Sequence, residues 1–433
     1  LHAVDDQLDV FRTITKWAHR VKEVGEIPEV LHEAMHQLTT GRPRPVELEI
    51  PLDLLAGECN ARILGPGNYP PITGNKSDMQ AAAQLLADAH NPVIIAGGGA
   101  LIAAASTELL ELATFLQAPV MTTQQGKGII PEGHDLAVGV NYAMVGPARE
   151  VVPECDVILA LGTRFLFRDL RIRKDQKIIQ IDVDSQVLGK NYPTEVAIEA
   201  DAREALVQLI EHLRRNALPK PSQREKIAVY KKAFASKLQQ LAPEQVKIIE
   251  TLRKCLADDA IVVSGITNIG SWSHFGYSVR RPRTYITSSY FGALGYAFPT
   301  ALGAQIAFPD RQVVTICGDG GFLYGVQELA TAMKYGLNVV TLVFNNNSYG
   351  ASEWHQTHDY GGRYIGTDLL NPDFVRLAES FGVIGLRATP ETLDAVLQKA
   401  LATQKPVIVE IALPNMMPPF HLVDRKSTPL EGI

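Results

Sequence analysis

The sequence predicts an α/β fold made of successive doubly wound, mostly parallel sheets. Short apolar segments of strand length alternate with helical patterns along most of the 433 residues, and this alternation favours parallel sheets covered by helices on both faces. The chain is too long for one hydrophobic core, so we expect two or three domains. Hydrophobic residues at 46 % and charged residues at 20 % are typical of an ordinary globular protein.

The first part of the chain, residues 1–57, predicts a helix and a strand without a complete domain. Apolar residues at helical spacing predict the helix at 27–38, and alternating apolar and acidic residues predict the strand at 46–50. The first residue is leucine, which suggests a piece of a longer chain. Residues 58–77 are rich in Gly, Pro and Asn without periodicity, and we interpret them as a linker.

The α/β alternation starts with a central domain at residues 78–214. Its strands are expected at 92–96, 119–122, 156–161 and 177–183. Three glycines, 97–99, follow the first of these strands and open a helix that we expect to run through residue 116.

A connecting helix is predicted within residues 215–242, which include a Lys-rich stretch. The last domain, residues 243–414, repeats the alternation. Its strands are expected at 260–263, 313–317, 339–344 and 407–411. We predict no regular structure for the tail at 415–433, which is rich in Pro and Met at its start.

Bulk properties exclude two classes of partner. The formal charge is −6 and no long basic stripe is present, which argues against nucleic-acid binding. No apolar stretch reaches the roughly 20 residues that span a bilayer, so we expect no membrane partner. The four cysteines form no C-x-x-C pair, and a reduced cytoplasmic location fits best.

The most informative segment is an apolar β-branched run at 313–317 that ends in Gly318-Asp319-Gly320-Gly321. Apolar residues at helical spacing follow it. A second apolar run, 339–344, then ends in three asparagines, 345–347. Strand, helix and strand in this order make a βαβ unit, whose right-handed crossover brings the carboxyl ends of both strands to one edge of the sheet.

Asp319 and Asn346 should therefore meet at this edge. A carboxylate and a carboxamide oxygen make the partial shell that magnesium accepts while it keeps diphosphate oxygens and water. A helix that begins after Gly321 would add free backbone N–H groups. The segment thus predicts a site for metal-bound diphosphate, and the alternative is a glycine-rich turn beside an asparagine-rich loop in an ordinary α/β domain.

This segment resembles the signature of thiamine diphosphate enzymes, which consists of Gly-Asp-Gly, a helix of this length and Asn-Asn after an apolar strand. The resemblance implies that Asp319, the Asn346 side chain and the Ser348 backbone carbonyl hold Mg²⁺. It extends the cofactor-binding set to these further residues of the two loops: Gly318, Gly320, Gly321, Tyr349 and Gly350.

A second cofactor segment resembles the family around Gly292-Ala293-Leu294-Gly295. By this resemblance Leu294 wedges between the two rings of thiamine and enforces the bent reactive conformer, while Gly292 offers its carbonyl to the aminopyrimidine; plain core packing is the alternative for Leu294 alone. Asn268 lies where relatives place polar contacts to the cofactor, although its neighbours differ from those of acetolactate synthases.

The resemblance covers nearly the whole chain and is strongest to the large catalytic subunit of acetolactate synthases. It implies a thiamine diphosphate-binding fold with a Rossmann-like central domain, which binds FAD in some relatives, ADP in others and nothing in many. Arg164 and Asp182 are candidates for nucleotide contacts or ordinary loop residues. Residues 1–57 resemble only the closing portion of a pyrimidine-binding domain, so the activating glutamate is absent from the chain, and Glu47 and Glu49 do not replace it.

The implied activity is decarboxylation of a 2-oxo acid with ligation of the remaining fragment to a second carbonyl compound, in a homodimer or homotetramer. Three alternatives stay open: a decarboxylase that does not ligate, including the oxalyl-CoA type, a pyruvate oxidase, and a cofactor-binding fragment that is inactive alone. The substrate is open because residues 350–356 depart from the family pattern, with Trp354 one position away from the substrate-selecting tryptophan. His355 and His358 are candidates for proton transfer or plain surface residues.

Two motifs point to other chemistry and are rejected. Residues 32–36 fit H-E-x-x-H, the zinc protease helix, but a helical wheel turns His32 and His36 to solvent and no third ligand follows. The glycines at 97–99 invite a nicotinamide dehydrogenase. Ile102 stands where the third glycine of G-x-G-x-x-G belongs, so this pattern fails.

Overall fold

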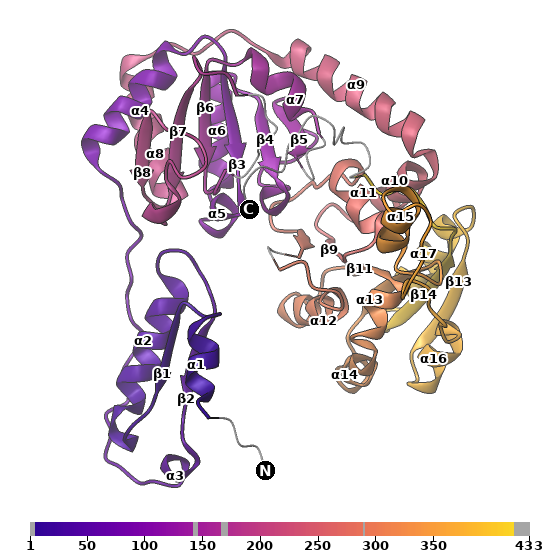
Figure 1. The fold of residues 1–433 in the computed structure, drawn as a ribbon. Helices are drawn as coiled ribbons and strands as arrows, with labels where there is room; N and C mark the ends of the chain where they lie inside the picture. The colour runs from indigo at the N-terminus through magenta and orange to yellow at the C-terminus, as the bar shows by residue number, and fades with distance from the viewer. Residues whose placement is uncertain (1–4, 142–145, 166–171, 289–290, 420–433) are drawn as a thin grey trace.

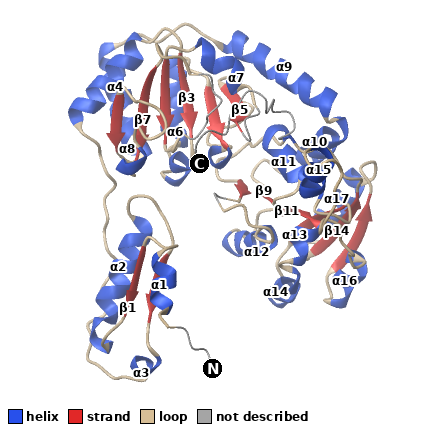
Figure 2. Ribbon diagram, in the orientation of Figure 1, coloured by secondary structure: helices blue, strands red, loops and turns tan. Residues whose placement is uncertain are grey.

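The computed structural model describes residues 5–141, 146–165, 172–288 and 291–419. Figure 1 shows a small N-terminal unit followed by two larger sheets with their helices. Both large sheets have six strands, and every strand pair in them is parallel. Helices flank both sheets (Figure 2), which confirms the predicted fold class. Among the described residues, no helix has the length and apolar character needed to span a bilayer.

The N-terminal unit pairs two short parallel strands against a helix. Its elements are α1 (Gln7–Arg12), β1 (Trp17–Arg20), α2 (Ile27–Thr39), β2 (Val46–Glu49) and α3 (Leu52–Leu55). The helix and strand predicted at 27–38 and 46–50 are confirmed as α2 and β2. The linker carries no helix or strand between α3 and α4.

The expectation that His32 and His36 face solvent holds only in part, because both residues are half-buried and the His36 side chain is 41 % exposed. The Tyr69 hydroxyl lies 3.3 Å from His32 Nδ1, and the Tyr69 ring stacks on His36 with 4.6 Å between ring centroids. A helical wheel considers only the helix, whereas the linker folds back over it. Among the described residues no group of three His, Cys, Asp or Glu side chains could hold a metal, so the H-E-x-x-H pattern has no metal centre there.

The central sheet has the strand order β5-β4-β3-β6-β7-β8. The chain runs from β3 outward to β5 and then returns to β6, which gives the doubly wound order whose carboxyl edge binds ligands at the reversal. The elements are α4 (Lys76–Asp88), β3 (Pro92–Ala96), α5 (Gly98–Ile102), α6 (Ser106–Leu116), β4 (Val120–Thr123), β5 (Ala137–Asn141), α7 (Ala148–Val151), β6 (Val157–Leu161), β7 (Lys177–Asp182), β8 (Val196–Glu199) and α8 (Ala202–Asn216).

The single helix predicted from residue 97 to 116 is two helices. Ala104 has a φ of +52° between α5 and α6, and a left-handed residue cannot continue a right-handed helix. The predicted connecting helix is α9 (Arg224–Leu241). In Figure 1 it lies on the outer side of the molecule and leads from the central sheet to the C-terminal sheet.

The C-terminal sheet has the order β10-β9-β11-β12-β14-β13. Alternate residues of its strands face two hydrophobic cores: Val262 and Val314 pack into one, Val263 and Val313 into the other. The elements are α10 (Pro243–Cys255), β9 (Ile261–Ser264), α11 (Asn268–Gly276), β10 (Tyr285–Thr287), α12 (Ala297–Ala307), β11 (Val313–Gly318), α13 (Asp319–Leu323), α14 (Leu329–Tyr335), β12 (Val339–Asn345), α15 (Gly350–His358), α16 (Phe374–Ser380), β13 (Ile384–Ala388), α17 (Leu393–Ala402) and β14 (Val407–Ala412).

The helix expected after Gly321 begins earlier and is interrupted. Its first part, α13, starts at Asp319 and ends at Leu323, and a 3₁₀ turn at Val326–Glu328 separates it from α14. Gly336 ends α14 in the left-handed conformation with a φ of +60°. The contribution of a long helix dipole to the diphosphate site is therefore smaller than the sequence suggested. Of the predicted tail, residues 415–418 carry no helix or strand, and residues 420–433 lie outside the described residues.

Candidate functional site

The carboxyl ends of β9, β11 and β12 surround a cavity of about 190 Å³, which we call the aspartate cavity. The strand order reverses between β9 and β11, and such a reversal is where open parallel sheets bind ligands. All but one of the predicted site residues line this cavity: Asn268, Leu294, Gly318, Asp319, Gly320, Gly321, Asn346, Ser348, Tyr349 and Gly350. Gly292, the exception, lies two residues before Leu294.

The acidic centre of this cavity is Asp319, whose side chain is only 3 % exposed. Its Oδ1 accepts a hydrogen bond from the Gly320 backbone N–H at 2.9 Å, and its Oδ2 accepts one from Asn371 Nδ2 at 2.7 Å. Burial raises the pKa of the carboxyl group, although these hydrogen bonds oppose the shift. No cationic side chain pairs with it among the ion pairs of the described residues, so a bound cation would favour its charged form.

Asn371 was not anticipated from the sequence, yet it organises both strand ends. Its Nδ2 also lies 2.9 Å from Asn345 Oδ1 and 3.2 Å from Asn347 Oδ1. Asn347 adopts a φ of +53°, a conformation that asparagine tolerates better than most residues. The strand-like loop that carries Asn371 is far away in sequence, and no local pattern of the two βα turns indicates it.

The β12 loop places Asn346 and Ser348 beside the carboxylate. Asn346 Nδ2 donates to Ser348 Oγ at 3.2 Å, which leaves the carboxamide oxygen as its remaining ligand atom. Ser348 forms an isolated antiparallel bridge with Asp368. The bridge bonds come from the neighbouring residues, Tyr349 N–H and the Asn347 carbonyl, so they do not use the Ser348 carbonyl.

Two glycines of the site have no room for a side chain. A Cβ on Gly320 would lie 2.6 Å from Tyr349 Cε1, and one on Gly350 would lie 2.6 Å from Asn415 Oδ1. By contrast, a Cβ on Gly321 would meet nothing closer than 4.0 Å. The backbone at Gly321 is thus open on the side where a ligand can approach closely.

Leu294 is held at the edge of the cavity between two left-handed glycines. Gly292 has a φ of +62° and Gly295 a φ of +81°. A Cβ on Gly295 would lie 2.5 Å from Tyr324 Cβ, so the loop fits closely against α13. The Leu294 side chain remains 37 % exposed, which differs from ordinary core packing and suits a residue that packs against a ligand.

The chain after β14 closes the opposite side of the cavity and was also missed by the sequence. Asn268 Nδ2 donates to the Met416 carbonyl at 2.6 Å, and Trp272 Nε1 donates to the Met417 carbonyl at 2.8 Å. Asn268 Oδ1 is buried without a hydrogen-bond partner among the described residues. A buried acceptor of this kind calls for a donor from a ligand or water.

The two histidines of α15 do not line the cavity. His355 Nδ1 lies 2.7 Å from Asp359 Oδ2, and the His358 ring stacks on Trp354 with 4.3 Å between centroids. The lining from α15 ends at Ser352. The surface alternative for these histidines therefore agrees better with the structure than a role in proton transfer within this cavity.

A second, larger cavity of about 900 Å³ lies at the carboxyl edge of the central sheet; we call it the glycine cavity. Gly98 and Gly99 after β3 and Gly162 and Arg164 after β6 line it, which places it at the strand reversal. Asp182, at the end of β7, lines it too, and burial raises the pKa of this carboxyl group.

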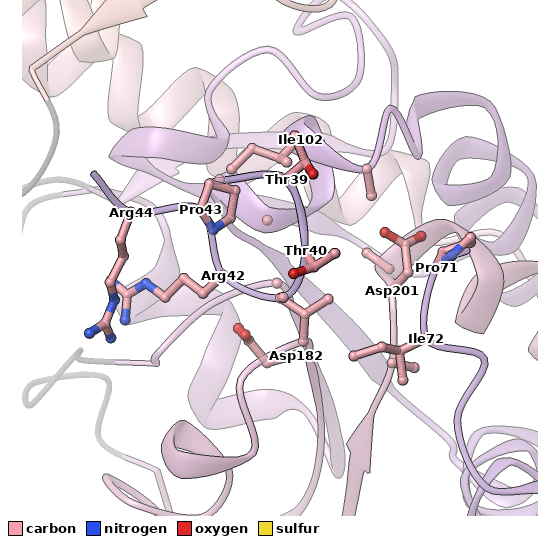
Figure 3. Close-up of a pocket in the computed structure, with 18 of the residues that line it drawn as sticks. Thr39, Thr40, Arg42, Pro43, Arg44, Pro71, Ile72, Ile102, Asp182 and Asp201 are labelled. Carbon is pink, nitrogen blue, oxygen red and sulfur yellow. The ribbon is translucent and has the colours of Figure 1, made fainter. Parts of the chain in front are cut away.

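The loop between α2 and β2 completes the glycine cavity. Figure 3 shows Arg42 and Arg44 from this loop reaching the same side of the cavity. Both guanidinium groups approach Asp184, at 3.8 Å and 3.6 Å. The wall therefore offers cationic, acidic and bare backbone groups together, a combination that suits the phosphate, ribose and chain of a nucleotide.

Comparisons with known proteins agree with this geometry. Residues 265–411 match the family model of the C-terminal TPP binding domain of thiamine pyrophosphate enzymes, and residues 79–209 match the central domain of the same enzymes. A probable acetolactate synthase large subunit of Methanocaldococcus jannaschii is 35 % identical over 96 % of this chain and 75 % of the relative. The chain belongs to the thiamine pyrophosphate enzyme family. Thiamine pyrophosphate and thiamine diphosphate are two names of one cofactor.

Other relatives within the thiamine pyrophosphate enzyme family carry similar names. The acetolactate synthase large subunit of Corynebacterium glutamicum is 34 % identical over 92 % of this chain and 67 % of its own length. The large subunit of acetolactate synthase isozyme 3 of Escherichia coli is 31 % identical over 92 % of this chain and 72 % of its own length. The recognition of an acetolactate synthase-like enzyme dependent on thiamine diphosphate is thus confirmed.

The matched segments cover the two cavities unequally. The match at 265–411 includes Asp319, Asn346 and Asn371, but it ends before Met416. The match at 79–209 includes the glycine loops but not Arg42 and Arg44, which come from the N-terminal unit.

Proposed function

We propose that this chain binds thiamine diphosphate with Mg²⁺ in the aspartate cavity and serves decarboxylation of a 2-oxo acid with ligation to a second carbonyl compound. The observation that carries the proposal is the buried Asp319 carboxylate beside Asn346 at adjoining ends of parallel strands. Relatives named acetolactate synthase support the reaction type.

The residues present fit the metal and the diphosphate. Asp319 and Asn346 offer one carboxylate and one carboxamide oxygen, and the Ser348 carbonyl adds a third oxygen. An incomplete oxygen shell is what Mg²⁺ accepts when phosphate and water complete it. The close approach of the backbone at Gly321 and the unpartnered Asn268 Oδ1 supply contacts for the rest of the ligand.

The protein's part in the reaction is binding, orientation and exclusion of water. Bound thiamine diphosphate supplies a nucleophilic carbon and a sink for the electrons left by loss of carbon dioxide. Leu294 would set the conformation of the cofactor, and Gly292 would offer its backbone carbonyl to the aminopyrimidine. Met416 and Leu413 would limit water access from the side of the tail.

Substitution of Asp319 by alanine tests the site. The Asp319→Ala variant should lose magnesium-dependent binding of thiamine diphosphate in calorimetry, whereas Asp175→Ala, an exposed aspartate of the central domain, should bind as the unchanged chain does. Unchanged binding by Asp319→Ala would refute the assignment. The thermal unfolding midpoint of each variant shows whether the variant still folds.

A panel of 2-oxo acids tests the reaction. Carbon dioxide release with a ligated product such as acetolactate supports the synthase-type proposal, and release of an aldehyde supports a decarboxylase that does not ligate. Dependence of turnover on FAD and oxygen would favour the oxidase alternative. Cofactor binding without decarboxylation of any 2-oxo acid would refute the proposed reaction for this chain and leave the cofactor-binding function.

The glycine cavity is proposed to bind a nucleotide, with FAD and ADP as the two candidates. Its volume of about 900 Å³ lies near the upper end of the range for ligand pockets, which leaves room for a dinucleotide. Gly98 and Gly99 lie where phosphate meets the first turn of this fold, and Asp182 is placed to accept a ribose hydroxyl. Titration with FAD and with ADP separates the candidates.

We also propose that the chain works as a homodimer or homotetramer. Large apolar or aromatic side chains remain exposed around the loops of the C-terminal sheet, among them Phe291 at 92 %, Tyr324 at 61 % and Leu370 at 102 %. Several exposed large apolar side chains beside a site suit a subunit interface. The molar mass in solution measured by light scattering tests this proposal.

A further inference from the structure

A short 3₁₀ turn after β4, η2 (Gln124–Gly126), connects the two cavities. Gln125 lines the glycine cavity. Its Nε2 also donates a hydrogen bond of 2.6 Å to the backbone carbonyl of Ser288. Ser288 directly follows β10 and precedes the loop with Leu294, so one side chain contacts both the nucleotide wall and the segment that leads to the cofactor loop.

Gln124 makes a second connection from the same turn. Its Nε2 donates to Thr287 Oγ1 at 3.2 Å and lies 3.3 Å from His274 Nε2. His274 belongs to α11, and Asn268 at the start of α11 lines the aspartate cavity. The two glutamines therefore hold both elements that carry cofactor-facing residues on this side.

The turn is packed too tightly to move independently of the glycine loop. A Cβ on Gly126 would lie 2.3 Å from the Ala96 carbonyl oxygen, and one on Gly98 would lie 3.0 Å from Gln125 Cβ. On its other side the buried Lys127 pairs with Glu132 at 2.7 Å, and Glu132 accepts the Val279 N–H at 2.8 Å. Close-packed contacts of this kind transmit a displacement instead of absorbing it.

We propose that Gln125 is a positioning residue through which a nucleotide in the glycine cavity tightens binding of thiamine diphosphate in the aspartate cavity. A nucleotide that contacts Gln125 restrains its side chain. The same side chain donates the hydrogen bond to the Ser288 carbonyl, so Ser288 is restrained as well. This restraint removes part of the conformational entropy that binding of the second ligand would otherwise have to remove around Ser288. By linkage, thiamine diphosphate tightens nucleotide binding by the same factor. The inference rests on the proposed function of both cavities.

Calorimetry measures the coupling directly. Thiamine diphosphate is titrated into the 433-residue chain with excess Mg²⁺, first alone and then with saturating ADP or FAD. One hydrogen bond between neutral groups corresponds to a coupling of about fivefold in the dissociation constant. We expect this ratio in the unchanged chain and a ratio near one in Gln125→Met, which keeps the side-chain length but lacks a donor.

The controls separate coupling from folding. Gln84→Ala removes an exposed glutamine of α4 whose amide donates to Asp88, and it should keep the fivefold ratio. Gln125→Asn, whose amide is too short to reach Ser288, should lose the ratio like Gln125→Met and provides a second variant should one fail to fold. A merely structural Gln125 would lower the thermal midpoint without changing the ratio.

The outcomes are distinct. Three results would overturn the coupling. The first is a ratio of one between the two dissociation constants in the unchanged chain, and the second is a fivefold ratio in both Gln125 variants. The third is failure of ADP and FAD to bind. Absence of magnesium-dependent thiamine diphosphate binding in the unchanged chain would instead overturn the proposed function on which the coupling rests.

Discussion

Replacement of Asn371 by alanine should weaken the magnesium site without touching a proposed ligand. The Asn371 amide donates to Asp319 Oδ2 at 2.7 Å and also holds Asn345 Oδ1 and Asn347 Oδ1. Asn371→Ala leaves the buried carboxylate with the Gly320 N–H as its remaining short donor. The Asp319 oxygens and the β12 loop then lose the group that fixes their relative position.

The expected magnitude follows from the loss of one hydrogen bond to a charged group. Such bonds contribute about 1.5–3 kcal/mol, and removal of a group that orients a metal ligand typically reduces metal affinity about 10- to 100-fold. Since Asp319 keeps its backbone donors, the Gly320 N–H among them, the lower end applies. We expect about a tenfold rise in the Mg²⁺ concentration that half-saturates cofactor binding.

The assay is a magnesium titration at fixed thiamine diphosphate, followed by calorimetry or by quenching of tryptophan fluorescence. Asn216→Ala is the matched control, because this exposed asparagine at the end of α8 donates to the His212 carbonyl and lies outside both cavities. An Asn371→Ala variant whose half-saturating Mg²⁺ stays within twofold of the control would refute the reasoning that the Asn371 amide positions the carboxylate.

Two further predictions concern stability. Gly97→Ala should destabilise the central domain by about 1–3 kcal/mol, because the new Cβ would lie 2.3 Å from the Gly162 carbonyl oxygen. The control is Gly303→Ala in α12, whose Cβ would meet nothing within 4 Å and which should be neutral or stabilising. Urea unfolding of both variants checks this prediction, and equal unfolding midpoints would contradict it. Burial lowers the pKa of His274 to about 3 from its usual 6.5, so the unfolded chain takes up a proton below pH 6.5 that the folded chain does not. The contribution of neutral His274 to the free energy of unfolding is fully present above pH 6.5 and falls by about 2 kcal/mol at pH 5. Unfolding at pH 8 and pH 5, followed through the fluorescence of buried Trp272, should depend less on pH in His274→Gln than in the unchanged chain. An equal pH dependence would refute the argument.

Within the two large sheets, the strands that the sequence predicted are the inner ones. An inner parallel strand such as β3 or β12 is buried on both faces and reads as a continuous apolar run. The four strands of these two sheets that were missed, β5, β8, β10 and β13, are their four edges; β1 of the N-terminal unit was missed as well. Edge strands are shorter or partly exposed, as β8 and β10 show, so their sequences resemble loops.

The candidate site divides in the same way. Asp319 and Asn346 were predictable because each directly follows a strand, and parallel topology alone brings strand ends together. Asn371 and Met416 reach the site from loops that lie later in the sequence and return to it. Their placement depends on tertiary packing, which no local pattern of apolar and polar residues encodes.

The two cavities share one geometric origin but differ in the residue that follows the first strand at each reversal. After β3 the chain continues with three glycines, which carry no charge and leave a cavity of about 900 Å³. After β11 the corresponding turn places Asp319 at 3 % exposure in a cavity of about 190 Å³. A buried carboxylate without a cationic side chain favours a metal-bound ligand, whereas bare backbone favours the ligand's own phosphate. Parallel-sheet topology thus sets where each cavity lies, and the residue that follows the first strand sets which kind of ligand the cavity favours.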